Sequence, residues 1–224
     1  MRRMGSIAAA ALLTAAALGH GVLSAAPQHA AAPGRTAALA GDRTAALAGD
    51  RTAALAAFET VRSVLQHPRC QNCHIPGDAP LQLDEGVNHT ENVQRGPAGL
   101  GVPGLPCSTC HASANSPASY GAHMPPGAPG WRLPPRSRKM VFIGLSPADL
   151  CATVKDPKRN GGRSLAALRE HLAHDKLVLW GWSPGVGRAP VAVPHDDLVA
   201  AVDTWIAAGA PCPPAAEAAK PAAR

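Results

Sequence analysis

The sequence predicts a mainly α-helical fold with extensive irregular loops and little or no sheet. Three observations favour this class. Apolar residues recur at three- and four-residue steps over residues 53–66, which places them on one face of a helix. The chain also contains 22 glycines and 23 prolines, which indicates long irregular segments. No run of alternating apolar and polar residues is long enough to indicate a substantial sheet.

The first expected helix covers residues 53–66. Its apolar face consists of Leu55, Phe58, Val61 and Leu65. In residues 75–106 turn residues dominate and no period is sustained, so loop with at most one short helix is expected. Residues 116–135 are richer still in Pro and Gly and are expected to be irregular.

Three more helices are expected in the C-terminal half. Ser146 is followed by proline and is placed to cap the first of them, and Ser164 is placed to cap the second, which carries a stripe of leucines. Asp196 or Asp197 opens the third, and Gly209 is suited to end it.

Both ends of the chain are expected to lie outside the folded domain. Residues 1–26 have a basic start, a short apolar run and small residues suited to cleavage, which is typical of a signal peptide for export to the periplasm. The alternative is a membrane anchor, but the apolar run falls well short of the roughly 20 residues that span a bilayer. Residues 27–52 contain an eight-residue repeat and are expected to be a low-complexity linker. The domain itself is expected over residues 53–213, with a disordered tail in residues 214–224.

The charge of the chain does not indicate a nucleic-acid partner. The formal net charge of +6 counts Arg2 and Arg3, which signal cleavage would remove, so the remaining excess is modest. No basic stripe is interleaved with aromatic residues. Membrane association is expected only if the signal is retained.

Two pentapeptides, residues 70–74 and 107–111, share the pattern Cys-x-x-Cys-His. In such a segment the two thiols can add to the vinyl groups of one haem, and the histidine is held against the iron as its axial ligand. Two copies in a chain with an export signal predict two covalently bound haem c groups. The expected attachment residues and proximal iron ligands are Cys70, Cys73, His74, Cys107, Cys110 and His111. Since aromatic residues make up only 3% of the chain, the haems are expected to organise a small c-type cytochrome fold.

Two other uses of these cysteines fit the sequence less well. A zinc site made of four thiolates is compatible with the spacing, but it leaves the histidine after each pair unexplained. A thioredoxin-like redox pair lacks its usual strand and helix context and does not explain the duplication.

The remaining cysteines, Cys151 and Cys212, lie outside the pentapeptides. An oxidising compartment would let them form a disulfide between the helix after Ser146 and the C-terminal segment. Two free buried thiols are the alternative.

The distal iron ligands are expected among His89, His171, Met124 and His123. Met124 and His123 belong to a proline-flanked loop, although Met124 is as well suited to filling a gap in the core. His89 lies midway between the pentapeptides. His171 borders the leucine stripe of its helix, whereas His174 points away from it. The sequence leaves His/Met and bis-His ligation open, and the two differ in reduction potential.

Several other stretches carry a resemblance to a known family. They are His67-Pro68-Arg69-Cys70, Gly77-Asp78-Ala79-Pro80-Leu81, Asn92-Val93-Gln94-Arg95-Gly96, Met124-Pro125-Pro126-Gly127-Ala128-Pro129, Arg159-Asn160-Gly161-Gly162-Arg163 and Trp180-Gly181-Trp182. With them, residues 58–213 resemble bacterial dihaem cytochromes labelled as isoquinoline 1-oxidoreductase subunits. The resemblance implies an electron-transfer partner of a molybdenum hydroxylase. Gly130 stands where that family has a histidine.

The expected function is therefore that of a periplasmic electron carrier. It would accept electrons from a molybdenum hydroxylase or other dehydrogenase and pass them to a downstream respiratory acceptor, without turning over a small molecule itself. Two alternatives remain. A dihaem peroxidase would need an open or displaceable iron position, and a haem-based sensor would need a signalling partner.

Overall fold

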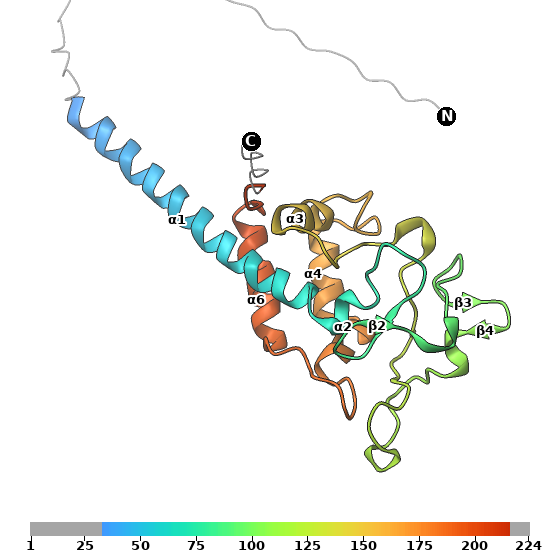
Figure 1. Cartoon of the computed structure of the whole chain (residues 1–224). Helices are drawn as coiled ribbons and strands as arrows, with labels where there is room; N and C mark the ends of the chain where they lie inside the picture. The colour runs from blue at the N-terminus through green and yellow to red at the C-terminus, as the bar shows by residue number, and fades with distance from the viewer. Residues whose placement is uncertain (1–32, 216–224) are drawn as a thin grey trace, which may run out of the picture. The chain divides into compact units, whose positions relative to one another are not determined.

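The computed structural model describes residues 33–215, with side chains from Gly49 onward (Figure 1). The expected signal peptide, residues 1–26, lies outside the described residues, as does most of the expected C-terminal tail. The chain divides into two compact units, residues 1–40 and 41–224. Only residues 33–40 of the first unit are described, all of them in one helix. Both pentapeptides lie in the second unit.

The described residues are mainly helical, and this part of the predicted fold class is confirmed. The α-helices are α1 (Pro33–Leu65), α2 (Pro68–Gln71), α3 (Pro147–Lys155), α4 (Leu165–His174), α5 (Lys176–Leu179) and α6 (His195–Ala207). Strands β1 (Leu81–Gln82) and β2 (Val87–Asn88) form one antiparallel pair, and β3 (Gly101–Val102) and β4 (Leu105–Pro106) form another. Short 3₁₀ turns cover Thr90–Asn92, Cys107–Thr109, Ala118–Tyr120, Arg136–Arg138 and Trp180–Trp182.

Helix α1 begins well before the expected start at residue 53. It includes the eight-residue repeat and so extends through residues 33–52, where the sequence suggested a linker. The physical reason is composition: Ala, Leu and Arg dominate the repeat, and their helix propensity outweighs the cost of one Gly and one Asp per copy. Among the described residues, no helix combines the length and apolar character needed to cross a membrane.

Two of the three expected helix starts in the C-terminal half follow the expected capping chemistry. The Ser146 side chain accepts a hydrogen bond from the Asp149 amide at 3.1 Å, and the Ser164 side chain accepts one from the Ala167 amide at 3.1 Å. Each bond satisfies an amide that has no partner within its own helix. The third start differs: α6 begins at His195, Pro194 occupies its N-cap without a side-chain hydrogen bond, and Asp196 lies in its first turn.

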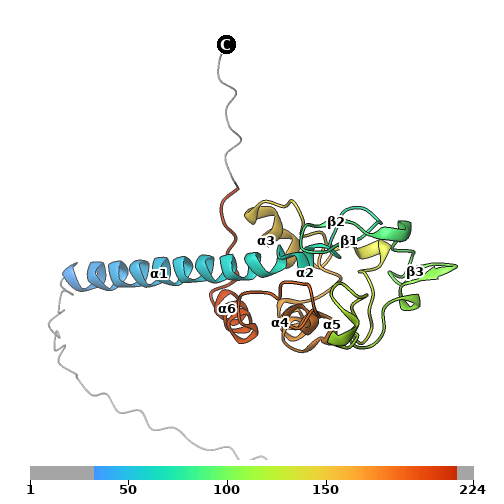
Figure 2. The same cartoon turned by 60° about the horizontal axis from the view of Figure 1, so that its bottom comes forward.

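The apolar core lies between α1, α3, α4 and α6, which gather on one side of the unit, whereas the loops and short strands occupy the other (Figures 1 and 2). Phe58 of α1 and Trp205 of α6 are fully buried, with ring centroids 5.1 Å apart. Cys151 of α3 forms a disulfide with Cys212, as expected from their place outside the pentapeptides. The helical side thus has an apolar core of its own. Between residues 75 and 135, the buried apolar side chains are only Ile75, Pro80, Ala128 and Leu133.

Candidate functional site

The first pentapeptide forms a tight helical turn at the end of α2. The His67 ring accepts a hydrogen bond from the Arg69 amide at 3.2 Å and so caps this helix. The Cys73 and His74 amides both donate to the Cys70 carbonyl at 3.2 Å. This turn keeps the two thiols and the imidazole on one short piece of backbone. Burial raises the pKa of Cys70 to about 12 and that of Cys73 to about 11, so both are neutral thiols at pH 7, unlike the reactive thiolate of a thioredoxin-like pair.

The second pentapeptide has the same backbone pattern. The amides of Cys110 and His111 donate to the Cys107 carbonyl at 3.2 and 3.0 Å. The second pentapeptide follows the hairpin of β3 and β4. The Cys107 amide donates a hydrogen bond to the Leu100 carbonyl at 3.0 Å. Two segments with different flanking residues therefore present two thiols and one imidazole in the same way.

Both histidines are fixed through the same ring nitrogen. His74 Nδ1 lies 2.7 Å from the Met140 carbonyl oxygen, and His111 Nδ1 lies 2.7 Å from the Pro126 carbonyl oxygen. A carbonyl can only accept, so Nδ1 carries the hydrogen and the Nε2 lone pair is free. Burial lowers the pKa of His74 to about 4 and also lowers that of His111. Both rings are therefore neutral at pH 7, with Nε2 available to a metal, which is the usual arrangement of a metal-binding histidine.

An aromatic ring stacks on each of these imidazoles. Phe142 lies against His74 with ring centroids 3.9 Å apart and an interplanar angle of 13°. Trp131 lies against His111 at 4.5 Å and 9°. These stacks hold each imidazole plane in one orientation, in addition to the hydrogen bond at Nδ1.

Each pentapeptide lies mainly at one of two cavities. The first cavity, of about 380 Å³, is lined by Cys70, Cys73 and His74. The second cavity, of about 240 Å³, is lined by Cys107, Cys110 and His111. The first is within the size range of small-molecule sites, which begins at about 300 Å³, and the second is somewhat smaller. The two cavities adjoin, because both are lined by Arg69, Cys73, Trp131, Arg132, Leu133 and Trp180.

The first cavity also contains His171 of α4. Its Nδ1 lies 3.2 Å from the Asp175 carboxylate, so Nε2 is free in the neutral ring. Burial lowers the pKa of His171, and Arg163 adds to this effect. His174 of the same helix is 70% exposed and pairs with Glu170. The structure thus brings only the first of these two histidines to the cavity.

The second cavity contains His89 and His123. His89 Nδ1 lies 2.9 Å from the Thr90 carbonyl oxygen, which again leaves Nε2 free. The His89 and His111 ring centroids are 6.1 Å apart, with the rings inclined at 64°. Two imidazoles that bind one metal from opposite sides, each at about 2.0 Å, have centroids about 6 Å apart.

The remaining candidates are placed differently. Met124 is 37% exposed and lines neither cavity. His123 has a positive φ of 60° and its amide donates to the Val186 carbonyl, but no hydrogen bond to a described residue fixes its ring. Met140 lines the first cavity on the side of His74. The Met140 carbonyl oxygen is the hydrogen-bond partner of His74 Nδ1.

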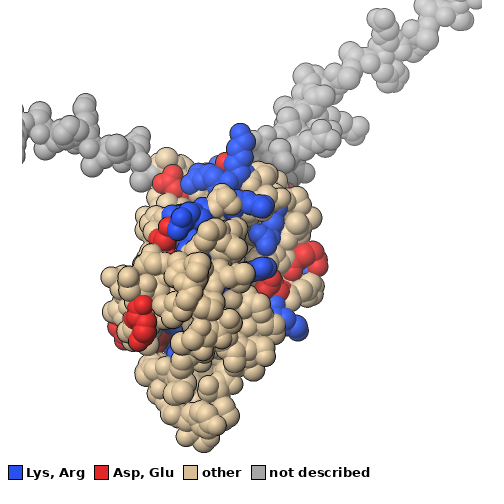
Figure 3. All heavy atoms as spheres, turned by 90° about the vertical axis from the view of Figure 1, so that its right-hand side faces the viewer, with Lys and Arg blue, Asp and Glu red and all other residues tan. Residues whose placement is uncertain are grey.

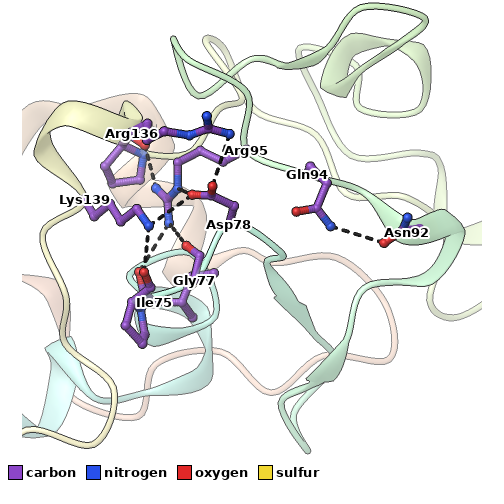
Figure 4. Close-up of polar contacts among 10 residues, drawn as sticks. Ile75, Gly77, Asp78, Asn92, Gln94, Arg95, Arg136 and Lys139 are labelled. Carbon is purple, nitrogen blue, oxygen red and sulfur yellow. Dashed lines mark hydrogen bonds and ion pairs between the residues drawn. The ribbon is translucent and has the colours of Figure 1, made fainter.

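Arg95 has a structural role in the loops that flank the first pentapeptide. It is completely buried and lines neither cavity. Its guanidinium donates to the carbonyls of Pro134, Ile75 and Gly77 at 2.5, 3.3 and 3.1 Å (Figure 4). Arg95 therefore ties the loop after the first pentapeptide to the segment before Met140.

Asp78 lies at the outer side of this cluster. It contacts Arg95 at 3.5 Å and Arg136 and Lys139 at 3.1 Å each (Figure 4). A hydrogen bond from Lys139 lowers the pKa of Asp78, and the two arginines lower it further. One carboxylate thus faces three cations, and this corner of the molecule keeps an excess of positive charge.

A haem fits the residues around the two cavities. Arg69, which lines both, pairs with Asp84 but has a buried Nε with no partner in the described part of the protein, as a propionate-binding arginine would. The flat aromatic walls and the free Nε2 atoms suit a planar iron cofactor. In the described part of the chain, no three His, Cys, Asp or Glu side chains are grouped to hold a metal ion directly.

Comparison with models of protein families, with curated protein sequences and with solved structures finds no match to this chain.

Proposed function

We propose that this chain is an electron-carrying c-type cytochrome with two haem c groups. Cys70, Cys73 and His74 would hold one of them, and Cys107, Cys110 and His111 the other. The observation that carries the proposal is the pairing within each cavity. A complete pentapeptide faces a second histidine, and all four imidazoles have Nδ1 bound to an oxygen and Nε2 free.

The proposed ligation is bis-His at both sites. His171 would be the distal ligand in the first cavity, where Asp175 orients its ring. His89 would be the distal ligand in the second, where its 6.1 Å separation from His111 suits one metal between them. Met124 and His123 would not be ligands. Bis-His ligation gives a lower reduction potential than His/Met ligation.

When bound, haem supplies an iron that gains or loses one electron without making or breaking a bond. The protein's residues hold the groups around the two sites in place, so that these groups move little when an electron is gained or lost. The carbonyls of Met140 and Pro126 and the Asp175 carboxylate orient the ligands and make their Nε2 atoms more basic. Arg69 and Arg132 are placed to balance propionate charge.

Electrons would pass between the two cavities across their shared wall. Trp131 and Trp180 belong to this wall, with ring centroids 5.0 Å apart and planes at 87°. Trp131 also stacks on His111. The wall is held in place by Asn115, which accepts a hydrogen bond from Trp180 Nε1 at 3.1 Å. A short and rigid connection suits a carrier that uses both haems in sequence.

A periplasmic location and a molybdenum hydroxylase as electron donor are part of the proposal. They rest on the signal-like N-terminus and on the family resemblance of residues 58–213. A respiratory protein would be the downstream acceptor.

A carrier is favoured over a dihaem peroxidase or a haem-based sensor by the two distal histidines. A peroxidase must bind peroxide at an open or displaceable iron position. Here each cavity offers a second imidazole whose orientation is already fixed. The protein therefore supplies two strong ligands for each iron.

The test is expression of the full chain for export in a bacterium with a working cytochrome c maturation system. We expect a mass increment for two haems, a low-spin optical spectrum and no peroxide turnover. A Cys107→Ala/Cys110→Ala variant should lose one haem, and the matching pair at the first site should lose the other. A colourless exported chain would refute the proposal, whereas a high-spin haem with peroxide turnover would favour the enzyme.

A further inference from the structure

Lys and Arg side chains gather in two segments, residues 132–139 and 155–163, over the upper part of the face seen in Figure 3. The segments meet where Arg138 donates to the Gly161 carbonyl at 3.2 Å. We define the basic patch as the exposed and half-buried cations of these segments, leaving out Lys155, whose Nζ donates to the Ala210 carbonyl at 2.6 Å. The patch consists of Arg132, Arg136, Arg138, Lys139, Lys158, Arg159 and Arg163.

Few carboxylates neutralise this patch. Asp156 is the only acidic residue within the two segments, and its carboxylate accepts a hydrogen bond from the Lys158 amide at 2.9 Å. Asp78 neutralises part of the charge of Arg136 and Lys139. Because Asp78 also contacts the buried Arg95, its one negative charge is divided among three cations. Lys158 and Arg159 are exposed, and no acidic side chain of the described residues forms an ion pair with them. The patch therefore keeps a local excess of positive charge.

The patch lies mainly at the first cavity, and of its members only Arg132 also lines the second cavity, at the wall that the two cavities share. Arg132, Arg138 and Arg163 all line the first cavity. By contrast, residues 96–131, which contain the second pentapeptide, include no Lys, Arg, Asp or Glu, and the lowest part of the face in Figure 3 is uncharged. The two proposed redox sites thus have different electrostatic surroundings.

We infer that the basic patch is the docking surface for an acidic protein that exchanges single electrons at the first cavity. This inference rests on the proposed function. In each exchange one electron leaves the site and reduces the partner's one-electron acceptor, or the reverse, with no bond or proton transferred. Complementary charge would speed the encounter and orient the first cavity toward the partner.

A protein partner is favoured over an anionic membrane by the composition of the patch. Basic surfaces that bind lipid bilayers usually insert apolar side chains beside their cations. The large apolar side chains that are exposed in the described residues are Val87, Leu100, Tyr120, Met124 and Val186, all outside the patch.

The first experiment measures the charge felt at the electron-exchange site of the haem-loaded full chain. Reduced protein is oxidised in a stopped-flow instrument by anionic hexacyanoferrate(III) or by the cationic tris(phenanthroline)cobalt(III) complex. The rate with the anion should fall as salt is added, and Lys158→Glu/Arg159→Glu should lower it about tenfold at low salt. Arg51→Glu/Lys176→Glu changes the net charge equally at exposed positions outside the patch, so its rate should stay close to that of the wild type. An equal loss in both variants overturns the inference, because net charge alone would explain it.

The second experiment measures binding without electron transfer. Poly-L-glutamate, a soluble acidic polypeptide, should bind the wild-type chain and the control variant at low salt but not Lys158→Glu/Arg159→Glu. Binding to phosphatidylglycerol vesicles without binding to poly-L-glutamate overturns the inference in favour of a membrane. A colourless chain refutes the proposed function and the docking surface together. A chain that carries two haems but does not bind poly-L-glutamate overturns the inferred docking surface and leaves the proposed function standing.

Discussion

The proposed ligand His171 can be tested by changing the carboxylate that orients it. Asp175→Asn removes one negative charge beside His171 Nδ1 but keeps a side-chain oxygen able to cap α5, because Asn caps helices as well as Asp does. The wild-type Asp175 accepts hydrogen bonds from the Leu177 and Val178 amides in this role. The substitution therefore changes the charge near the first cavity while it leaves the local fold in place.

The size of the effect follows from the distance between the carboxylate and the proposed iron. Asp175 Oδ2 lies 3.2 Å from Nδ1, and crossing the ring and one metal–nitrogen bond adds about 4 Å. Two unit charges about 7 Å apart interact by about 2 kcal/mol at an effective dielectric constant of 20. Because the Asp175 side chain is 39% exposed, solvent screening reduces this to about 1 kcal/mol. That energy corresponds to about 50 mV for one electron.

The reduction potential should rise in Asp175→Asn. In the wild type the Asp175 carboxylate stabilises the ferric state more than the ferrous state, and the substitution removes this negative charge. Optical redox titration of the purified dihaem protein measures both potentials. One should rise by about 50 mV and the other should stay nearly unchanged. Glu170→Gln is the matched control, since Glu170 pairs with the exposed His174 on the same helix. No shift, a fall, or an equal shift of both haems in Asp175→Asn would refute the ligation of His171.

Three further predictions concern the second site and the helical core. His89→Ala should convert one haem to a high-spin state that binds carbon monoxide, whereas His123→Ala should keep both haems low-spin; the opposite result in optical spectra would exchange their roles. Cys151→Ala/Cys212→Ala opens a loop with a sequence separation of 61 and should lower the free energy of unfolding by about 4 kcal/mol in urea titrations; an unchanged midpoint would contradict this. Phe58→Ala removes a fully buried ring and should cost about 3–5 kcal/mol in the same assay, and a loss below about 1 kcal/mol would show that the core collapses around it.

Local features of the fold could be predicted because they depend on neighbouring residues. Ser146 and Ser164 cap their helices through amides three residues away, and such contacts follow from the order of the residues alone. The start of α1 differs from the prediction because a low-complexity repeat suggests a flexible linker, although its alanines favour helix. Helices α2 and α5 were not predicted, because four-residue helices carry no periodic signal.

The sequence by itself determined the two pentapeptides at which we propose that haem is attached. Thiol, thiol and imidazole lie within five residues, and in both pentapeptides they share one helical turn, so each pentapeptide is a local unit. Only the tertiary structure decided which other groups meet these units. Met140 and Pro126 act through backbone carbonyls, whose positions no side-chain pattern reveals. His171 and His89 reach the cavities through the packing of α4 and of a loop, and Arg95 is buried by segments far apart in the chain. Such contacts depend on the summed packing of the whole domain, which no short segment encodes.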